Sequence, residues 1–238
     1  MNIYMLGNGN IRSKNFNASF LINDNILVDT PGGTLKELAK TNKNLDDIKI
    51  IIITHLHGDH TFDLPFIIQS EKIRKREGKL IIIGPKNLKK YLAKLTMLAF
   101  NNPLEKYINS LDITFLDSQS VQNNEIAEGM YLSSVSVKHG PMKDCYGFIL
   151  KSNDKKLGFT GDAAMCPGLT YMVKQVNYCI IDVAEDSSNT HLKFKEFKQL
   201  ASDTEVKYIP VHFPDELEKD LMQIQNVKII KPHEQFYI

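Results

Sequence analysis

The sequence predicts an α/β protein in which two β-sheets pack face to face and helices cover their outer sides. Short apolar runs typical of strands gather in residues 2–53 and again in residues 113–160. Amphipathic stretches with helical spacing come between the later runs. A doubly wound sheet would alternate strand and helix along the whole chain, so the grouping of the strands favours two sheets.

The first half of the chain opens with a strand-like run that ends at the turn-forming residues 7–10. Asn23-Asp24-Asn25 predicts a hairpin between the next two runs. Apolar residues at helical intervals predict helices beginning at 35–38 and spanning 61–75 and 85–100. We expect the lysines of the last of these helices to form a solvated face. The strands are expected at residues 2–6, 19–22, 26–28, 50–53 and 80–83.

The second half has strand-like runs first and helices later. Asn153-Asp154 predicts a hairpin, and Thr190 or Asn189 is the expected N-cap of the helix that begins near residue 192. The tail is expected to add one or two strands. The helices are expected at residues 169–175, 192–201 and 217–224, and the strands at residues 113–116, 130–138, 147–150, 157–160, 178–183 and 206–211.

Composition limits the class of protein. The chain has 238 residues, 42% of them hydrophobic, which is enough for a substantial core, and no linker or repeat divides it. The net charge of +1 disfavours extensive binding of a nucleic-acid backbone, although a local basic patch is compatible with it. Three well-separated cysteines form no disulfide framework, and there is no leader and no long apolar span. We therefore expect a single-domain, cytoplasmic protein that makes no contact with a membrane.

The segment Thr54–His60 is the strongest functional signal. It carries three histidines and one aspartate on a loop that leaves the end of a buried strand. Residues two apart on an extended segment point the same way, so His55 and His57 can reach one metal ion. Asp59 and His60 follow a glycine turn and can hold a second ion beside the first. Imidazole and carboxylate ligands suit zinc, with manganese and iron as alternatives.

Three further polar residues stand at the ends of separate apolar strands, namely His139, Asp162 and His212. Because strand ends can meet at one edge of a sheet, we expect these side chains to join the histidine cluster in a single site for two divalent ions. The expected ligands are His55, His57 and His139 for one ion, Asp59, His60 and His212 for the other, and Asp162 as a bridge.

These residues and the short motifs around them follow one another along the chain in an order that resembles the metallo-β-lactamase superfamily, and most closely its ribonuclease Z branch. The resemblance covers nearly the whole chain, and His191 lies before His212, where that branch carries an extra catalytic histidine. The segment 54–60 matches the motif of the superfamily. The matching motifs elsewhere are Leu6-Gly7-Asn8-Gly9, Val28-Asp29, His139-Gly140, Tyr146-Gly147, Thr160-Gly161-Asp162 and His212-Phe213.

The resemblance implies a four-layer αββα sandwich over residues 1–238, a dinuclear site that commonly holds zinc, and a homodimer. It implies hydrolysis by a metal-bridged hydroxide, which Asp59 would orient or deprotonate. His191 would protonate the leaving alkoxide, the alternative being a surface residue at the start of a helix. Asp29 is expected behind the metal ligands, where it hydrogen-bonds the loops that carry them, or else as a residue of the turn at 31–33.

One departure from the branch bears on the substrate. Full ribonuclease Z enzymes carry a long arm for transfer RNA between the motifs of His139 and Asp162, whereas residues 140–161 here leave room only for a hairpin. The missing arm and the near-neutral charge favour hydrolysis of a small or cyclic-nucleotide-type phosphodiester, as in short members of the branch. RNA is the alternative substrate if the lysine-bearing helix 86–98 replaces the arm. The motifs are also compatible with a thioester or lactone hydrolase and with a non-catalytic metal-bound scaffold.

Overall fold

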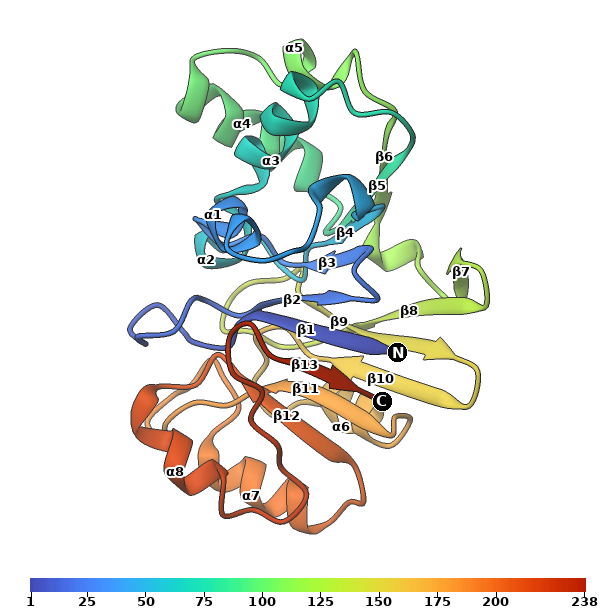
Figure 1. Cartoon of the computed structure of the whole chain (residues 1–238). Helices are drawn as coiled ribbons and strands as arrows, with labels where there is room; N and C mark the ends of the chain where they lie inside the picture. Colours follow the sequence, from blue (N-terminus) through green and yellow to red (C-terminus); the bar gives the residue numbers. More distant parts are fainter.

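A strand that is apolar at consecutive positions, rather than alternately apolar and polar, must be buried on both faces. The computed structural model, which describes residues 1–238, provides this cover by stacking two sheets between two layers of helices (Figure 1). Helices α1–α5 lie outside one sheet and α6–α8 outside the other. The αββα architecture expected from the sequence is therefore confirmed.

The first sheet has seven strands in the order β13-β1-β2-β3-β4-β5-β6. Strands β13 to β3 pair antiparallel, and β3 to β6 pair parallel. The two termini lie near each other because β13 adds to the outer side of β1 (Figure 1). The strands are β1 (Asn2–Gly7), β2 (Ser19–Ile22), β3 (Ile26–Val28), β4 (Ile50–Ile52), β5 (Leu80–Gly84), β6 (Ile113–Asp117) and β13 (Gln235–Tyr237).

The second sheet has six strands in the order β12-β11-β10-β9-β8-β7. Strands β10, β11 and β12 are parallel to one another, whereas β7 to β10 form an antiparallel meander. The strands are β7 (Asn124–Ala127), β8 (Met130–Ser136), β9 (Tyr146–Ser152), β10 (Lys155–Phe159), β11 (Tyr178–Asp182) and β12 (Lys207–Val211).

The helices on the first sheet connect its parallel strands, and those on the second sheet connect or follow β10 to β12. None of them has the length and hydropathy needed to cross a bilayer. The helices are α1 (Thr34–Ala39), α2 (Gly58–Thr61), α3 (Leu64–Ile73), α4 (Leu88–Phe100), α5 (Glu105–Ile108), α6 (Pro167–Val173), α7 (Phe194–Ser202) and α8 (Glu218–Leu221), with 3-10 turns at Leu45–Asp47, Ser118–Ser120 and Asp215–Leu217.

Three apolar clusters hold the layers together. The central one lies between the sheets and includes Phe148 and Phe159, whose rings stack 5.3 Å apart. The two others lie between each sheet and its helices. The sequence of strand β4 is continuously apolar because both of its faces are buried. Ile50 and Ile52 face the other sheet, and Ile51 faces the helices.

Several element boundaries differ from the sequence predictions for tertiary reasons. The helix expected over 61–75 is α3, over Leu64–Ile73, and the end of the expected loop forms the separate short helix α2. Asp63 lies at the break between them, where it accepts a hydrogen bond from the Leu35 backbone N–H and donates its own N–H to the Thr30 carbonyl. Helix α7 begins at Phe194 with Lys193 as its N-cap, so neither Thr190 nor Asn189 caps it. The helix expected over 217–224 is shorter, and β7 was not predicted because it is a short, largely exposed edge strand.

Candidate metal centre

The loops that carry the expected ligands leave neighbouring strand ends and meet at one edge of the two sheets. Helix α2, with Asp59 and His60, lies at this edge beside the loop that follows β1 (Figure 1). Backbone hydrogen bonds tie the loops of the two sheets together. They join Tyr146 N–H to Thr54 O at 3.1 Å and His212 N–H to Asn8 O at 2.7 Å. A further bond, from Ala164 N–H to Lys138 O at 2.8 Å, joins two loops of the second sheet.

One group of ligand atoms gathers around His57. Its Nδ1 lies 3.1 Å from His55 Nε2 and 3.1 Å from His139 Nε2. Oδ2 of Asp162 closes the group at 3.8 Å from the Nε2 atoms of both His55 and His139. The sequence predicted that these three histidines would come together, and the fold brings them together although His139 is on the other sheet.

A second group lies beside the first and shares Asp162 with it. His60 Nε2 is 3.3 Å from Asp162 Oδ1, and His212 Nε2 is 3.5 Å from Asp162 Oδ2. Asp59 Oδ2 is 3.4 Å from His212 Nε2 and 3.9 Å from His60 Nε2. The Asp162 carboxylate therefore faces both groups, as a bridging ligand would.

Two observations indicate that these groups fit metal ions. Four ligands placed tetrahedrally around zinc at about 2.0–2.1 Å lie about 3.4 Å from one another, close to the separations found here. Nε2 of His60 is also fully buried and has no hydrogen-bond partner, although its other ring nitrogen is bonded. A buried polar atom without a partner is costly, and a metal ligand bond would satisfy it. The two clusters suit a dinuclear metal site.

Asp29 lies behind His60, one of the candidate ligands. Its Oδ2 accepts a hydrogen bond from His60 Nδ1 at 2.8 Å and another from Thr54 Oγ1 at 2.9 Å. Its Oδ1 accepts the Thr54 backbone N–H at 2.8 Å. The backbone of Asp29 is left-handed, with φ of 55°, a conformation that aspartate tolerates better than most residues. This carboxylate fixes which nitrogen of His60 faces the site.

His191 lies inside the site rather than on the surface. Its ring stacks on His212 at 5.0 Å, and its Nδ1 lies 2.8 Å from Asp182 Oδ2. The other oxygen of Asp182 is 3.5 Å from His212 Nδ1. Sequence reasoning missed Asp182. A signal was present, since it is the one charged residue in the buried strand Tyr178–Asp182.

Asp182 also contributes to a third group of potential ligands, with Asp162, His191 and His212. Its Oδ2 already accepts the Ala163 backbone N–H at 3.0 Å and faces His191 Nδ1. Its Oδ1 is buried without a hydrogen-bond partner and lies 3.5 Å from His212 Nδ1, the ring nitrogen opposite the one that faces Asp59 and Asp162. These contacts with His191 and His212 fit a residue that orients the two rings.

Electrostatics differ between the two groups. Burial, followed by the charge of His60, lowers the pKa of His55 well below its usual value, which favours the neutral imidazole that binds metal. Burial would lower the pKa of His212 too, but Asp162 and hydrogen bonds to Asp182 and Asp59 outweigh it and raise that pKa to about 10. Burial raises the pKa of Asp59, yet His212 and His60 bring it down to about 2. A metal cation competes for the place of the proton on His212.

A cavity of about 530 Å³ opens over these groups. Asp59, His191 and His212 form its floor, and its mouth is formed by the loop after β1 and the loop after β11. Most of its lining residues are polar, with Ser187, Ser188 and Thr190 among them. The cavity gives a solvent-borne substrate direct access to the ligand clusters.

Comparison with known proteins identifies relatives of the whole fold. The family model described as anti-Pycsar protein Apyc1 matches residues 1–236. A ribonuclease Z from Saccharolobus islandicus is 29% identical in an alignment of length 197 that covers 66% of this chain and 66% of that protein. The match thus spans just under two thirds of that relative's length.

Two solved structures share the fold. The short form of human tRNase Z aligns with a TM-score of 0.74 and 19% identity, over 100% of this chain and 99% of its own. A diphosphatase of the PhnP family aligns with a TM-score of 0.76 and 15% identity, over 100% and 97% of the two chains. At these identities the similarity shows the fold alone.

The position of Asp29 generates a testable prediction about metal affinity. Replacing Asp29 with Asn removes the carboxylate that orients His60, and we expect zinc affinity to fall about ten- to hundredfold. Competition with a chromophoric chelator measures this affinity. Asp24→Ala is the matched control, because Asp24 pairs with Lys43 outside the site. Equal affinities of Asp29→Asn and the wild type would show that Asp29 only shapes its turn.

Proposed function

The chain belongs to the family of anti-Pycsar protein Apyc1 and to the ribonuclease Z-like branch of the metallo-β-lactamase superfamily, and from this premise we propose that it is a phosphodiesterase that hydrolyses a small, cyclic-nucleotide-type phosphodiester. Its relatives support the broader class of metal-dependent hydrolase. The phosphodiester substrate is our inference from the site.

The observation that carries this proposal is the short connection between His139 and Asp162. Strands β9 and β10 form a plain hairpin that turns at Asn153, so no arm projects from this part of the chain. The cavity over the clusters is about 530 Å³, within the range of roughly 300–1,000 Å³ typical of sites for small molecules. A small polar phosphodiester suits such a cavity better than a folded RNA does.

We assign the metal ligands as the distances suggest, with Asp162 shared between two ions. Zinc is the proposed metal because imidazole and carboxylate at these separations suit it, and manganese or iron are the alternatives. Bound ions of this kind supply Lewis acidity and lower the pKa of water to near 7. The proposed ligands are His55, His57, Asp59, His60, His139, Asp162 and His212.

The chain's own residues have distinct proposed roles. Asp59 is the least buried of the carboxylates in the clusters and lines the cavity, so it can orient the attacking water or accept its proton. His191 also lines the cavity, and because Nδ1 is bonded to Asp182, its Nε2 is the nitrogen left to protonate a leaving alkoxide. Burial lowers the pKa of His191, but the hydrogen bond and charge of Asp182 outweigh this and raise it, which favours the protonated form of an acid.

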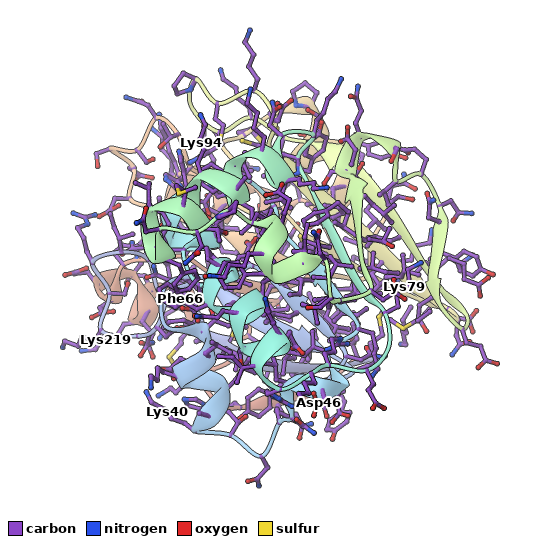
Figure 2. All side chains as sticks on the ribbon, turned by 90° about the horizontal axis from the view of Figure 1, so that it is seen from above. Lys40, Asp46, Phe66, Lys79, Lys94 and Lys219 are labelled. Atoms are coloured by element: carbon purple, nitrogen blue, oxygen red, sulfur yellow. The ribbon has the colours of Figure 1, made fainter.

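A transfer-RNA 3′-processing endonuclease is the second candidate, because the curated relatives are named ribonuclease Z. It would need a basic surface to replace the arm. Figure 2 looks onto the outer helices, where Lys94 of α4 marks the lysine-bearing face. Cleavage of a precursor transfer RNA distinguishes this candidate from the first. Thioester or lactone hydrolysis is the third candidate, since the clusters alone do not choose between phosphorus and carbon.

We further propose a homodimer in the cytoplasm. The outer helices expose apolar side chains that a second copy could cover, with Phe66 at 43% and Met97 at 46% exposure. Figure 2 shows Phe66 on this face. The three cysteines are free and buried, which suits a reducing compartment.

The catalytic proposal predicts a dependence on the leaving group. We expect metal-loaded protein to hydrolyse both bis(p-nitrophenyl) phosphate and 3′,5′-cyclic nucleotides, and Asp59→Ala to abolish both activities. His191→Ala should lower kcat for cyclic nucleotides about 10²–10⁴-fold, because their alkoxide leaving group needs a proton. The loss on bis(p-nitrophenyl) phosphate should be much smaller, since p-nitrophenolate leaves without one.

The control for these assays is His233→Ala, which removes a histidine that pairs with Glu37 away from the site. A panel of cyclic nucleotides, a precursor transfer RNA, a thioester and a lactone should be tested with the same preparations. Turnover of a thioester or lactone without any phosphodiester turnover would contradict the proposal. Cleavage of the precursor transfer RNA alone would favour the second candidate.

The dimer proposal predicts a single-residue effect on assembly. Phe66→Glu places a charge on the outer face of α3 and should shift the protein from dimer to monomer, as measured by light scattering after size-exclusion chromatography. Tyr171→Glu is the matched control, because Tyr171 is an exposed aromatic residue on α6 in the opposite layer. A monomeric wild type, or a dimer unaffected by Phe66→Glu, would contradict this interface.

A further inference from the structure

Two charged side chains meet at the mouth of the cavity. Arg12 Nη2 lies 2.5 Å from Glu185 Oε1, and both residues line the cavity that also contains Asp59 and His191. Arg12 comes from the loop after β1 and Glu185 from the loop after β11. Their side chains are 69% and 40% exposed, far more than Asp162 at the base, so the pair lies at the entrance.

The backbone of Arg12 is fixed relative to the metal clusters. Its N–H donates to Asn10 Oδ1 at 2.8 Å, and Asn10 is itself buried. The next residue, Ser13, donates from Oγ to the Phe213 carbonyl at 2.8 Å, directly after the proposed ligand His212. The guanidinium is therefore presented from a loop that is anchored to the segment carrying a metal ligand.

The cavity offers few other partners for a nucleobase. None of its lining residues is Phe, Tyr or Trp, and Arg12 is the only lysine or arginine among them. The histidines at its floor belong to the metal clusters and their immediate neighbours. A guanidinium is planar and stacks on bases and other aromatic faces, whereas an ammonium is a point charge. The Glu185 carboxylate, paired with it, limits the orientations that this plane can take.

We propose that Arg12 contacts the base of a cyclic mononucleotide by stacking and that Glu185 is the positioning residue that holds the guanidinium for it. This assignment rests on the proposed phosphodiesterase function and deepens it, because it names the residues that recognise the base of the substrate. The scissile phosphate is held at the metal clusters, and the base points toward the mouth. Arg12 then determines which phosphodiesters are good substrates without taking part in bond cleavage.

The test compares substrates with and without a base. Kinetics of the metal-loaded protein are measured on the four 3′,5′-cyclic ribonucleotides and on the base-free 3′,5′-cyclic phosphate of methyl riboside. Arg12→Ala should lower kcat/KM for at least one cyclic nucleotide about tenfold, mainly through KM, because stacking acts equally in ground and transition states. The base-free substrate should change less than about twofold.

Three variants separate stacking from charge and from structure. Arg12→Lys keeps the charge but loses the plane, so we expect it to resemble Arg12→Ala. In Glu185→Ala, the ratio of kcat/KM for the cyclic nucleotide to that for the base-free substrate should fall about threefold. Glu185→Gln should restore part of this ratio, because an amide oxygen can still accept a hydrogen bond. Lys14→Ala is the matched control, since Lys14 is an exposed cation on the same loop outside the cavity lining.

Equal losses on both kinds of substrate in Arg12→Ala would overturn the inference, since Arg12 would then act on the phosphate or on the loop. Wild-type behaviour of Arg12→Lys would overturn stacking as the mechanism.

Equilibrium binding of the same compounds to the metal-loaded His191→Ala protein gives a readout that needs no turnover. If the wild type hydrolyses no phosphodiester, the proposed function fails. An Arg12-dependent preference for base-bearing ligands in binding would still support the contact, and its absence would overturn it.

Discussion

The carboxylate of Asp162 is the feature on which the rest of the site depends. It is 3% exposed, and a buried carboxylate costs several kcal/mol unless opposite charge or hydrogen-bond donors surround it. Burial raises its pKa, but His212 and His60 outweigh this and hold it well below its usual value. The surrounding imidazoles come from loops of both sheets. The sheets must therefore present their strand ends at one edge for this carboxylate to be tolerated, and two cations placed beside it would compensate it further.

Two further buried carboxylates, Asp29 and Asp182, orient histidines around Asp162. Asp29 binds the rear nitrogen of His60, and Asp182 binds that of His191 while facing His212. Each fixes the ring orientation of a histidine whose other nitrogen faces the clusters or the cavity. The cavity above is polar and small, and Arg12 and Glu185 close part of its mouth. The residues proposed for metal coordination, for proton transfer and for substrate selection thus all lie at one edge of the two sheets.

Much of this arrangement could be predicted from the sequence, because it follows local patterns. The histidine segment and the polar residues at strand ends predicted which side chains would converge, and the two groups of strands predicted two sheets. Features set by distant contacts could not be predicted in this way. The break before α3 depends on the hydrogen bond from Leu35 to Asp63. Asp182 ends an apolar strand, which was a usable signal, but its contacts with His191 and His212 form only in the folded chain. Arg12 and Glu185 meet only after the chain has folded, since strands β2 to β11 lie between them in sequence.

The most direct test of the account is anomalous diffraction from crystals of the zinc-loaded protein. We expect two peaks roughly 3.5–4 Å apart, the spacing of two-metal sites, with the Asp162 carboxylate between them. One peak should lie within bonding distance of His55, His57 and His139, and the other near Asp59, His60 and His212. A single peak, or a peak ligated by Asp182 and His191, would contradict the bridging role of Asp162 and the division of ligands that follows from it.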